Sequence, residues 1–76
     1  MPQDFLGQEL LVGDVVAFLN NYNEEQTGMI ESIKGGKFCS ILSRGKLGLF
    51  IDIRKCSKIQ KLTNPKIVFE VNRDLA

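Results

Sequence analysis

Two cysteines and the absence of histidine limit the chemistry that this chain of 76 residues can perform. Cys39 and Cys56 are too far apart in the sequence for a CxxC motif, and no histidine is present to complete a zinc site with them. The commonest general base, and the usual partner of a serine or cysteine nucleophile, is also missing. We therefore expect no metal, and we predict that both cysteines are reduced, buried and structural.

The other polar motifs are weak catalytic signals. Glu24 and Glu25 are neighbours in a polar stretch, which is typical of a solvated pair rather than of a tuned acid and base. Gly35-Gly36 and Gly45-Lys46-Leu47-Gly48 match neither the phosphate-binding loop nor the dinucleotide fingerprint, and they predict turns. The sequence thus predicts a protein that is not an enzyme and needs no cofactor.

Strand and turn signals alternate along the chain, and no segment shows a long helical period with caps. We expect strands over 14–19, 27–34, 38–42, 47–53 and 58–62, with a long exposed loop over 20–26. Gly28 marks a close backbone approach or a bulge in the second strand. Alternation predicts an interior that contains Val16, Phe18, Ile30, Ile33, Ile41, Ile51 and Ile59.

The C-terminal residues follow a break in the strand pattern. After a break at Thr63-Asn64-Pro65, residues 67–71 (Ile-Val-Phe-Glu-Val) have strong strand propensity. We expect an added edge strand or a partner-binding arm, and an unpaired edge would offer a route to a homo-oligomer. The chain is then a single domain, with a barrel over about 10–62 and a C-terminal extension over 63–76.

Short antiparallel strands with tight turns predict an all-β fold, a small five-stranded antiparallel barrel, because the chain is too short for a sandwich. The segments Val12-Gly13-Asp14-Val15-Val16-Ala17 and Gly28-Met29-Ile30-Glu31-Ser32-Ile33 resemble small SH3-like proteins of the KOW and Tudor kind. The chain is also similar to short uncharacterised proteins encoded by bacteriophages, in which a basic C-terminal strand follows. The resemblance implies an SH3-like barrel and a phage origin. This chain has an acidic loop after the first strand, whereas in KOW proteins that bind nucleic acid this loop is often basic.

Nothing in the sequence indicates a membrane protein. No apolar run approaches the roughly 20 residues of a membrane helix, and residues 1–10 lack the order of a secretory signal. We expect a cytoplasmic protein, in the host cytoplasm if it is phage-encoded, with no membrane partner.

Charge is divided unevenly along the chain. Residues 1–33 carry a formal charge of −6 and residues 34–76 carry +7, within a net charge of +1. Such asymmetry is a hint of contact with nucleic acid or an acidic partner. The alternative is that interleaved strands bring the two halves together as surface ion pairs, each of which contributes little.

Two binding functions fit these patterns. In the first, a basic rim contacts nucleic acid or a ribonucleoprotein where the Gly35-Gly36 turn and the end of the fourth strand meet. Its predicted residues are Lys34, Lys37, Arg54, Lys55, Lys58 and the aromatic Phe50. In the second, a phage-type module inhibits or modulates a host protein through the 20–26 loop or the C-terminal strand. Its predicted residues are Tyr22, Glu24, Glu25, Ile67 and Phe69.

Overall fold

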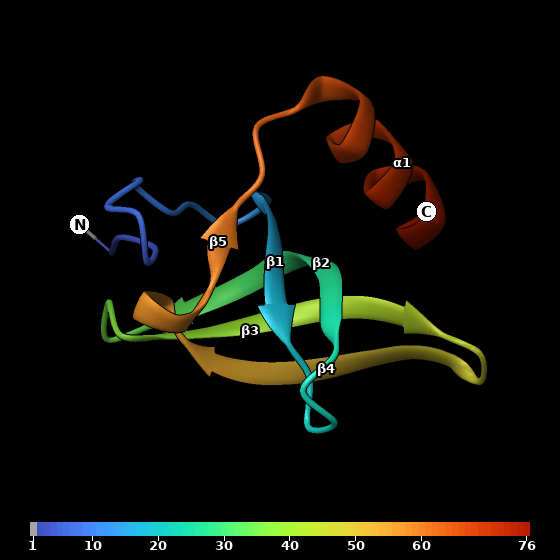
Figure 1. The fold of residues 1–76 in the computed structure, drawn as a ribbon, viewed down its shortest axis with the longest axis horizontal. Coiled ribbons are helices and arrows are strands. Elements are labelled where there is room, and N and C mark those ends of the chain that lie inside the picture. The colour runs from blue at the N-terminus through green and yellow to red at the C-terminus, as the bar shows by residue number, and fades with distance from the viewer. Residues whose placement is uncertain (1) are drawn as a thin grey trace.

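One antiparallel sheet of five strands dominates the fold (Figure 1). The computed structural model describes residues 2–76. Its elements are β1 (Val15–Leu19), β2 (Glu25–Lys34), β3 (Phe38–Gly45), β4 (Gly48–Lys55), a 3₁₀ helix η1 (Cys56–Lys58), β5 (Gln60–Lys61) and α1 (Pro65–Leu75). The strands lie in the order β4-β3-β2-β1-β5. The prediction of a mostly β fold with five antiparallel strands is confirmed, whereas α1 was not expected. No helix within residues 2–76 has the length and apolar character needed to cross a membrane.

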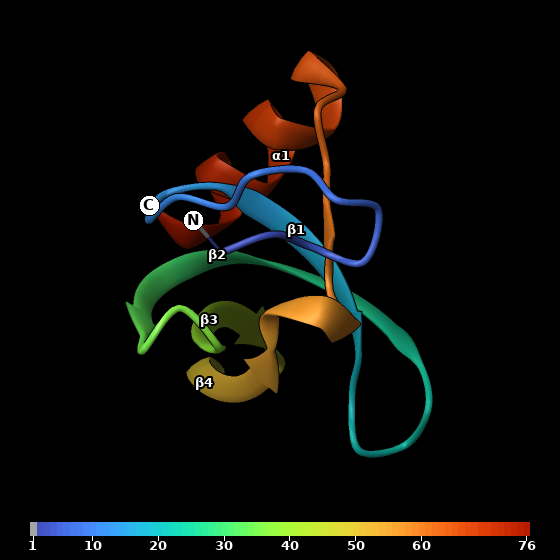
Figure 2. The same ribbon diagram turned by 90° about the vertical axis from the view of Figure 1, so that its left-hand side faces the viewer.

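The predicted barrel does not close. β4 pairs only with β3, and β5 pairs only with β1, so both strands are edges of an open sheet. Figure 2 shows the sheet curling, with β3 and β4 lying beneath β1 and β2. η1 occupies 56–58, and the strand expected over 58–62 is reduced to the two residues of β5.

The predicted C-terminal strand is wrong, because 67–71 lie in α1. The Asn64 side chain caps the helix by accepting hydrogen bonds from the N–H groups of Lys66 (2.9 Å) and Ile67 (3.4 Å). Pro65 follows at the first helical position, where its missing N–H costs nothing. These start signals outweigh the β-propensity of the segment. The helix buries Val71 and contacts β1, β2 and β3.

The hydrophobic core lies on the inner face of the curled sheet. Five of the predicted interior residues are buried there, namely Val16, Phe18, Ile30, Ile41 and Ile59, together with Leu10, Cys39 and Cys56. Ile33 is half-buried against this cluster. Ile51 was predicted inside but is 53% exposed, because it pairs with Leu42 on the outer face, whereas Asp52 pairs with the buried Ile41.

Two local features fix the strands and the N-terminal segment. At Gly28, a Cβ would lie 2.5 Å from Ser43 Oγ, so the expected close approach is confirmed, while the register shift lies between Ile30 and Ser32. The buried Asp4 carboxylate accepts hydrogen bonds from the N–H groups of Leu6 (2.9 Å), Gln8 (2.8 Å) and Lys61 (2.7 Å). Asp4 thereby ties the first residues to β5.

Candidate interaction surfaces

Three lysines gather at the end of the sheet that carries the β2–β3 turn. Phe38 pairs with Lys34 on β2 and with Lys55 on β4, and Lys37 precedes Phe38 in the chain. Lys37, Lys55 and Phe38 line a cavity of about 320 Å³, and no carboxylate in residues 2–76 lines it. We call Lys34, Lys37 and Lys55 the basic cluster. It comprises three of the five cations predicted for the basic rim.

Arg54 was predicted at the same rim, but its donors are used within the chain. Its Nε donates to the Leu19 carbonyl at 3.1 Å, its Nη1 to the Ile53 carbonyl at 2.8 Å, and its Nη2 to Asn21 Oδ1 at 3.2 Å. The guanidinium carbon also lies 5.4 Å from the centroid of the Phe18 ring. Arg54 therefore holds β4 to the end of β1 across the opening of the sheet.

Phe50 and Lys58 also lie away from the basic cluster. Phe50 pairs with Ser43 and packs against Gly45, near the β3–β4 turn at the opposite end of β4. Lys58 lies on η1 and lines a different groove. Register arguments cannot place Lys58, because it belongs to no strand.

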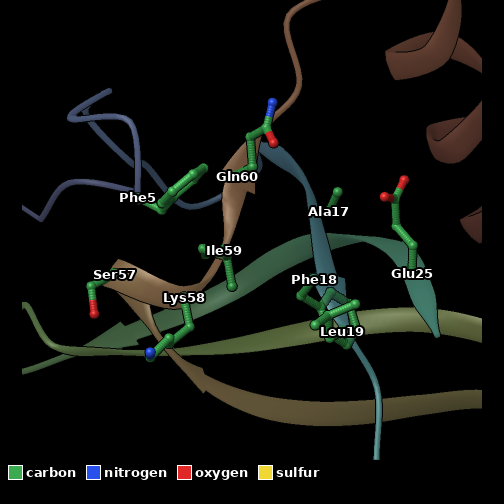
Figure 3. A pocket seen from close by; sticks show the side chains of 9 residues that line it. All are labelled: Phe5, Ala17, Phe18, Leu19, Glu25, Ser57, Lys58, Ile59 and Gln60. Carbon is green, nitrogen blue, oxygen red and sulfur yellow. The ribbon is translucent and has the colours of Figure 1, made fainter. Parts of the chain in front are cut away.

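That groove, of about 310 Å³, runs between β1 and the η1–β5 segment (Figure 3). Phe5 and Ile59 lie on one side of it, and Phe18 and Leu19 lie on the other. Lys58 and Glu25 add opposite charges to the lining. The groove is open and its lining is mixed, with Phe18 and the N-terminal Phe5 as its aromatic residues. Sequence analysis did not single out Phe5.

The residues of the alternative prediction are exposed but divided among elements. Tyr22 and Glu24 lie in the β1–β2 loop, where Asn20 Oδ1 accepts hydrogen bonds from both of their N–H groups, at 2.8 Å and 3.0 Å. Glu25 begins β2. Ile67 and Phe69 are exposed on α1, and so cannot act as an edge strand.

The cysteines and acidic residues are the candidate metal ligands or nucleophiles of this chain. Within 2–76, no three histidine, cysteine or acidic side chains come close enough together to hold a metal ion. Cys39 and Cys56 are free and buried. Burial raises the pKa of the Cys39 thiol to about 12, with further contributions from the hydrogen bond and charge of Cys56, so a thiolate is disfavoured at neutral pH.

An aliphatic row on β4 is the most apolar exposed feature of the sheet. Leu49, Ile51 and Ile53 alternate along the strand on its outer face and are 49%, 53% and 62% exposed. We call these three residues the β4 row. Leu42 lies beside Ile51 on β3 and is half-buried. The principal contacts of α1 are with β1, β2 and β3, so the helix covers the other part of the same outer face.

Comparison with known proteins identifies a family. Residues 2–46, more than half of the chain, match the family described as "Domain of unknown function (DUF7205)". The chain belongs to this family. No curated protein and no solved structure matches it.

The DUF7205 match ends at the β3–β4 turn. It includes the Asp4 anchor, the Gly28 contact and two lysines of the basic cluster. Lys55 and the β4 row lie beyond it. Sequence reasoning missed the β4 row as a surface because alternation distinguishes two faces of a strand without saying which is covered. The only sequence signal is the row itself, three aliphatic residues at a spacing of two.

Proposed function

We propose that this protein is a non-catalytic binding domain that recognises another protein chain through the β4 row. The observation that carries this proposal is the half to two-thirds exposure of three aliphatic side chains on one face of an edge strand. Contiguous exposed apolar patches on soluble domains mark interaction sites, and covering them gains roughly 25 cal/mol per Å² of apolar area. We also propose that the fold is SH3-like. The strand order and the curl of the sheet are those expected of an SH3-like barrel that is open between β4 and β5.

The surroundings of the β4 row also favour a protein partner. Asp52 and Arg54, the charged residues of β4 before Lys55, lie on the inner face, where they approach within 3.8 Å of each other. The outer-face cations are Arg44, which pairs with Leu49, and Lys55, and they lie at the two ends of the β4 row. The outer face of β4 between Gly48 and Arg54 therefore carries only aliphatic side chains. Depletion of charge at the centre of a patch is the compositional signature of a protein interface.

Nucleic-acid binding is the second candidate, and the basic cluster supports it. Lys37 and Lys55 line one cavity with Phe38, whose side chain is 43% exposed, and a base could stack on that ring. The candidate is weaker than a protein partner because Arg54 and Lys58 do not join the cluster. Three phosphate contacts give a modest, strongly salt-dependent affinity.

A capture experiment separates the two candidates. The tagged protein is used as bait in an extract of its natural host, with and without nuclease, beside Ile51→Glu and the double variant Lys37→Glu/Lys55→Glu. We expect the bait to capture a protein, which can be an untagged copy of this chain added to the extract. Neither nuclease nor the two lysine substitutions should reduce this capture. Ile51→Glu should abolish it, because a charge would be buried in an apolar interface.

Folding is the control for this experiment. All three substituted residues are exposed, so the free energy of unfolding should change by less than about 0.5 kcal/mol in each variant. Capture that is lost with nuclease, or lost in the lysine variant and retained in Ile51→Glu, would favour nucleic acid and reject the proposal.

A further inference from the structure

The free edge of β4 can be located residue by residue from the strand register. In an antiparallel ladder, pairs that exchange both backbone hydrogen bonds alternate with pairs that exchange none. The two-residue turn between Gly45 and Gly48 makes this closing pair a bonded one. Lys37 and Cys56 would form the next pair after Phe38 and Lys55, and alternation makes that pair a bonded one. The Cys56 N–H does bond to the Lys37 carbonyl, at 2.8 Å.

It follows that the even-numbered residues of β4 bond to β3, whereas Leu49, Ile51 and Ile53 point their N–H and C=O groups towards the free edge. The hydrogen bond from Arg54 Nη1 to the Ile53 carbonyl supports this, because that oxygen is turned away from β3. The β4 row thus combines exposed aliphatic side chains with backbone groups that no strand pairs within residues 2–76.

We propose that two copies of this chain associate through antiparallel pairing of β4 about a two-fold axis at Ile51. The inference rests on the proposed function and names its partner as a second copy. Ile51 then lies opposite Ile51 of the second copy, and Leu49 lies opposite Ile53. Each of these pairs exchanges both backbone hydrogen bonds, and the Ile53 carbonyl accepts a second bond because it has two lone pairs.

This register is the one that matches the whole row. With Ile51 on the axis, all six aliphatic side chains of the two rows lie side by side on one outer face. A shift of two residues would place Leu49 opposite the charged Lys55, or Ile53 opposite Leu47, which lies outside β4. A shift of one residue would place the free N–H and C=O groups of one copy opposite residues of the other copy whose N–H and C=O groups already bond to β3. The two strands could then not pair.

A second copy fits this edge better than an unrelated extended peptide. A long edge strand with aliphatic side chains favours aggregation unless it is paired or covered. A two-fold pairing covers the β4 edges of both copies at once and is closed, since the other edge of each sheet is the two-residue β5. A peptide from another protein would cover one edge only.

The test uses cysteine cross-linking and sedimentation of the full chain. Ile51→Cys places a thiol opposite its own copy at a separation that a disulfide can span, about 5.5 Å between Cα atoms. Under mild oxidation we expect Ile51→Cys to become mainly a disulfide-linked dimer. Leu49→Cys alone should remain mainly monomeric, and an equimolar mixture of Leu49→Cys with Ile53→Cys should cross-link. The unsubstituted protein, whose own thiols are buried, provides the baseline.

Sedimentation gives a readout that is independent of cysteine. The unsubstituted protein should show the mass of two chains, and Ile51→Lys should show the mass of one, because two lysines would face each other on the axis. Unchanged circular dichroism would show that Ile51→Lys is folded. A monomeric unsubstituted protein, or Ile51→Cys cross-linking no faster than Leu49→Cys, would overturn the pairing. If the pairing is overturned, capture of a different protein that Ile51→Glu abolishes would still uphold the proposed function, whereas the absence of any such capture would then reject both.

Discussion

The Sγ atoms of Cys39 and Cys56 lie 3.0 Å apart in a buried contact that joins β3 to η1. Both residues belong to the hydrophobic core, with 0% and 4% exposure. The contact packs η1 against the sheet at the point where a closed barrel would have continued its last strand. Protonation of Cys39 therefore bears on the stability of the open sheet.

We expect the free energy of unfolding to fall as the pH rises from about 9 towards 12. Burial, followed by the hydrogen bond and charge of Cys56, raises the pKa of Cys39 from its ordinary value of 9.0 to about 12. The stabilisation is fully present below the ordinary value. Above it, the unfolded thiol loses its proton while the folded thiol keeps it, so rising pH favours unfolding. Urea titrations of the protein and of Cys39→Ala at about pH 8 and about pH 10.5 measure this. An equal decline in both proteins would contradict the prediction.

Gly28→Ala should destabilise the protein by about 1 to 3 kcal/mol. The new Cβ would lie 2.5 Å from Ser43 Oγ and 2.6 Å from the Leu42 carbonyl oxygen, and the latter cannot move without shifting β3. Urea unfolding provides the measurement, with Thr27→Ala at an exposed neighbouring position as the matched control. The double variant Gly28→Ala/Ser43→Ala should recover only part of the loss, because the carbonyl contact remains. Wild-type stability in Gly28→Ala would mean that the strands are less closely packed than described.

Asp4→Asn should cost about 1 to 3 kcal/mol, because the amide cannot accept all the bonds that the carboxylate accepts from the N-terminal segment and β5. Burial alone would raise the pKa of Asp4. The hydrogen bonds from Lys61, Gln8 and Leu6 outweigh burial and hold the pKa below its ordinary value of 3.8. The stabilisation is therefore present above that value and is lost as the pH falls below it.

The check is urea unfolding of both proteins at about pH 7 and about pH 3. The difference between Asp4→Asn and the unsubstituted protein should shrink in acid. Asp74→Asn, at an exposed position near the end of α1, is the control and should have little effect at either pH. A difference that is the same at both pH values would show that the Asp4 charge does not matter.

The first four strands were predictable because their signals are local. β-branched and aromatic runs mark their extents, and Gly35 and Gly36 both adopt positive φ (61° and 67°), as expected for a tight turn. The turn is one residue longer than predicted, because residues 35–37 lie between the paired Lys34 and Phe38. α1 was missed because Asn64-Pro65 was interpreted as a break, although the same dipeptide is a cap followed by a first helical residue. Local propensity favoured a strand there, and the cap decided against it.

The candidate sites were predictable only where register places them. Hairpin parity brings Lys34, Lys37 and Lys55 to one end of the sheet, as expected. Arg54 could not be assigned in this way, because its side chain reaches Leu19 across the curl of the sheet, which no sequence pattern encodes. The exposed face of Ile51 has a similar origin, since it depends on where α1 packs and on the failure of the barrel to close.

The basic cluster gives the last prediction, which concerns salt dependence. If its three lysines each neutralise a phosphate, log affinity for a single-stranded oligonucleotide should fall with log salt at a slope of about −2, from about −0.7 per contact. Lys37→Glu/Lys55→Glu should flatten this slope and weaken binding equally for all sequences, because phosphate contacts carry no sequence information. Lys46→Glu/Lys66→Glu has the same change in net charge at exposed positions outside the cluster, on the β3–β4 turn and α1. Titration of a labelled mixed-sequence oligonucleotide at two salt concentrations distinguishes a site from general charge. If both double variants lose the same affinity, the effect is one of net charge, and the basic cluster is not a nucleic-acid site.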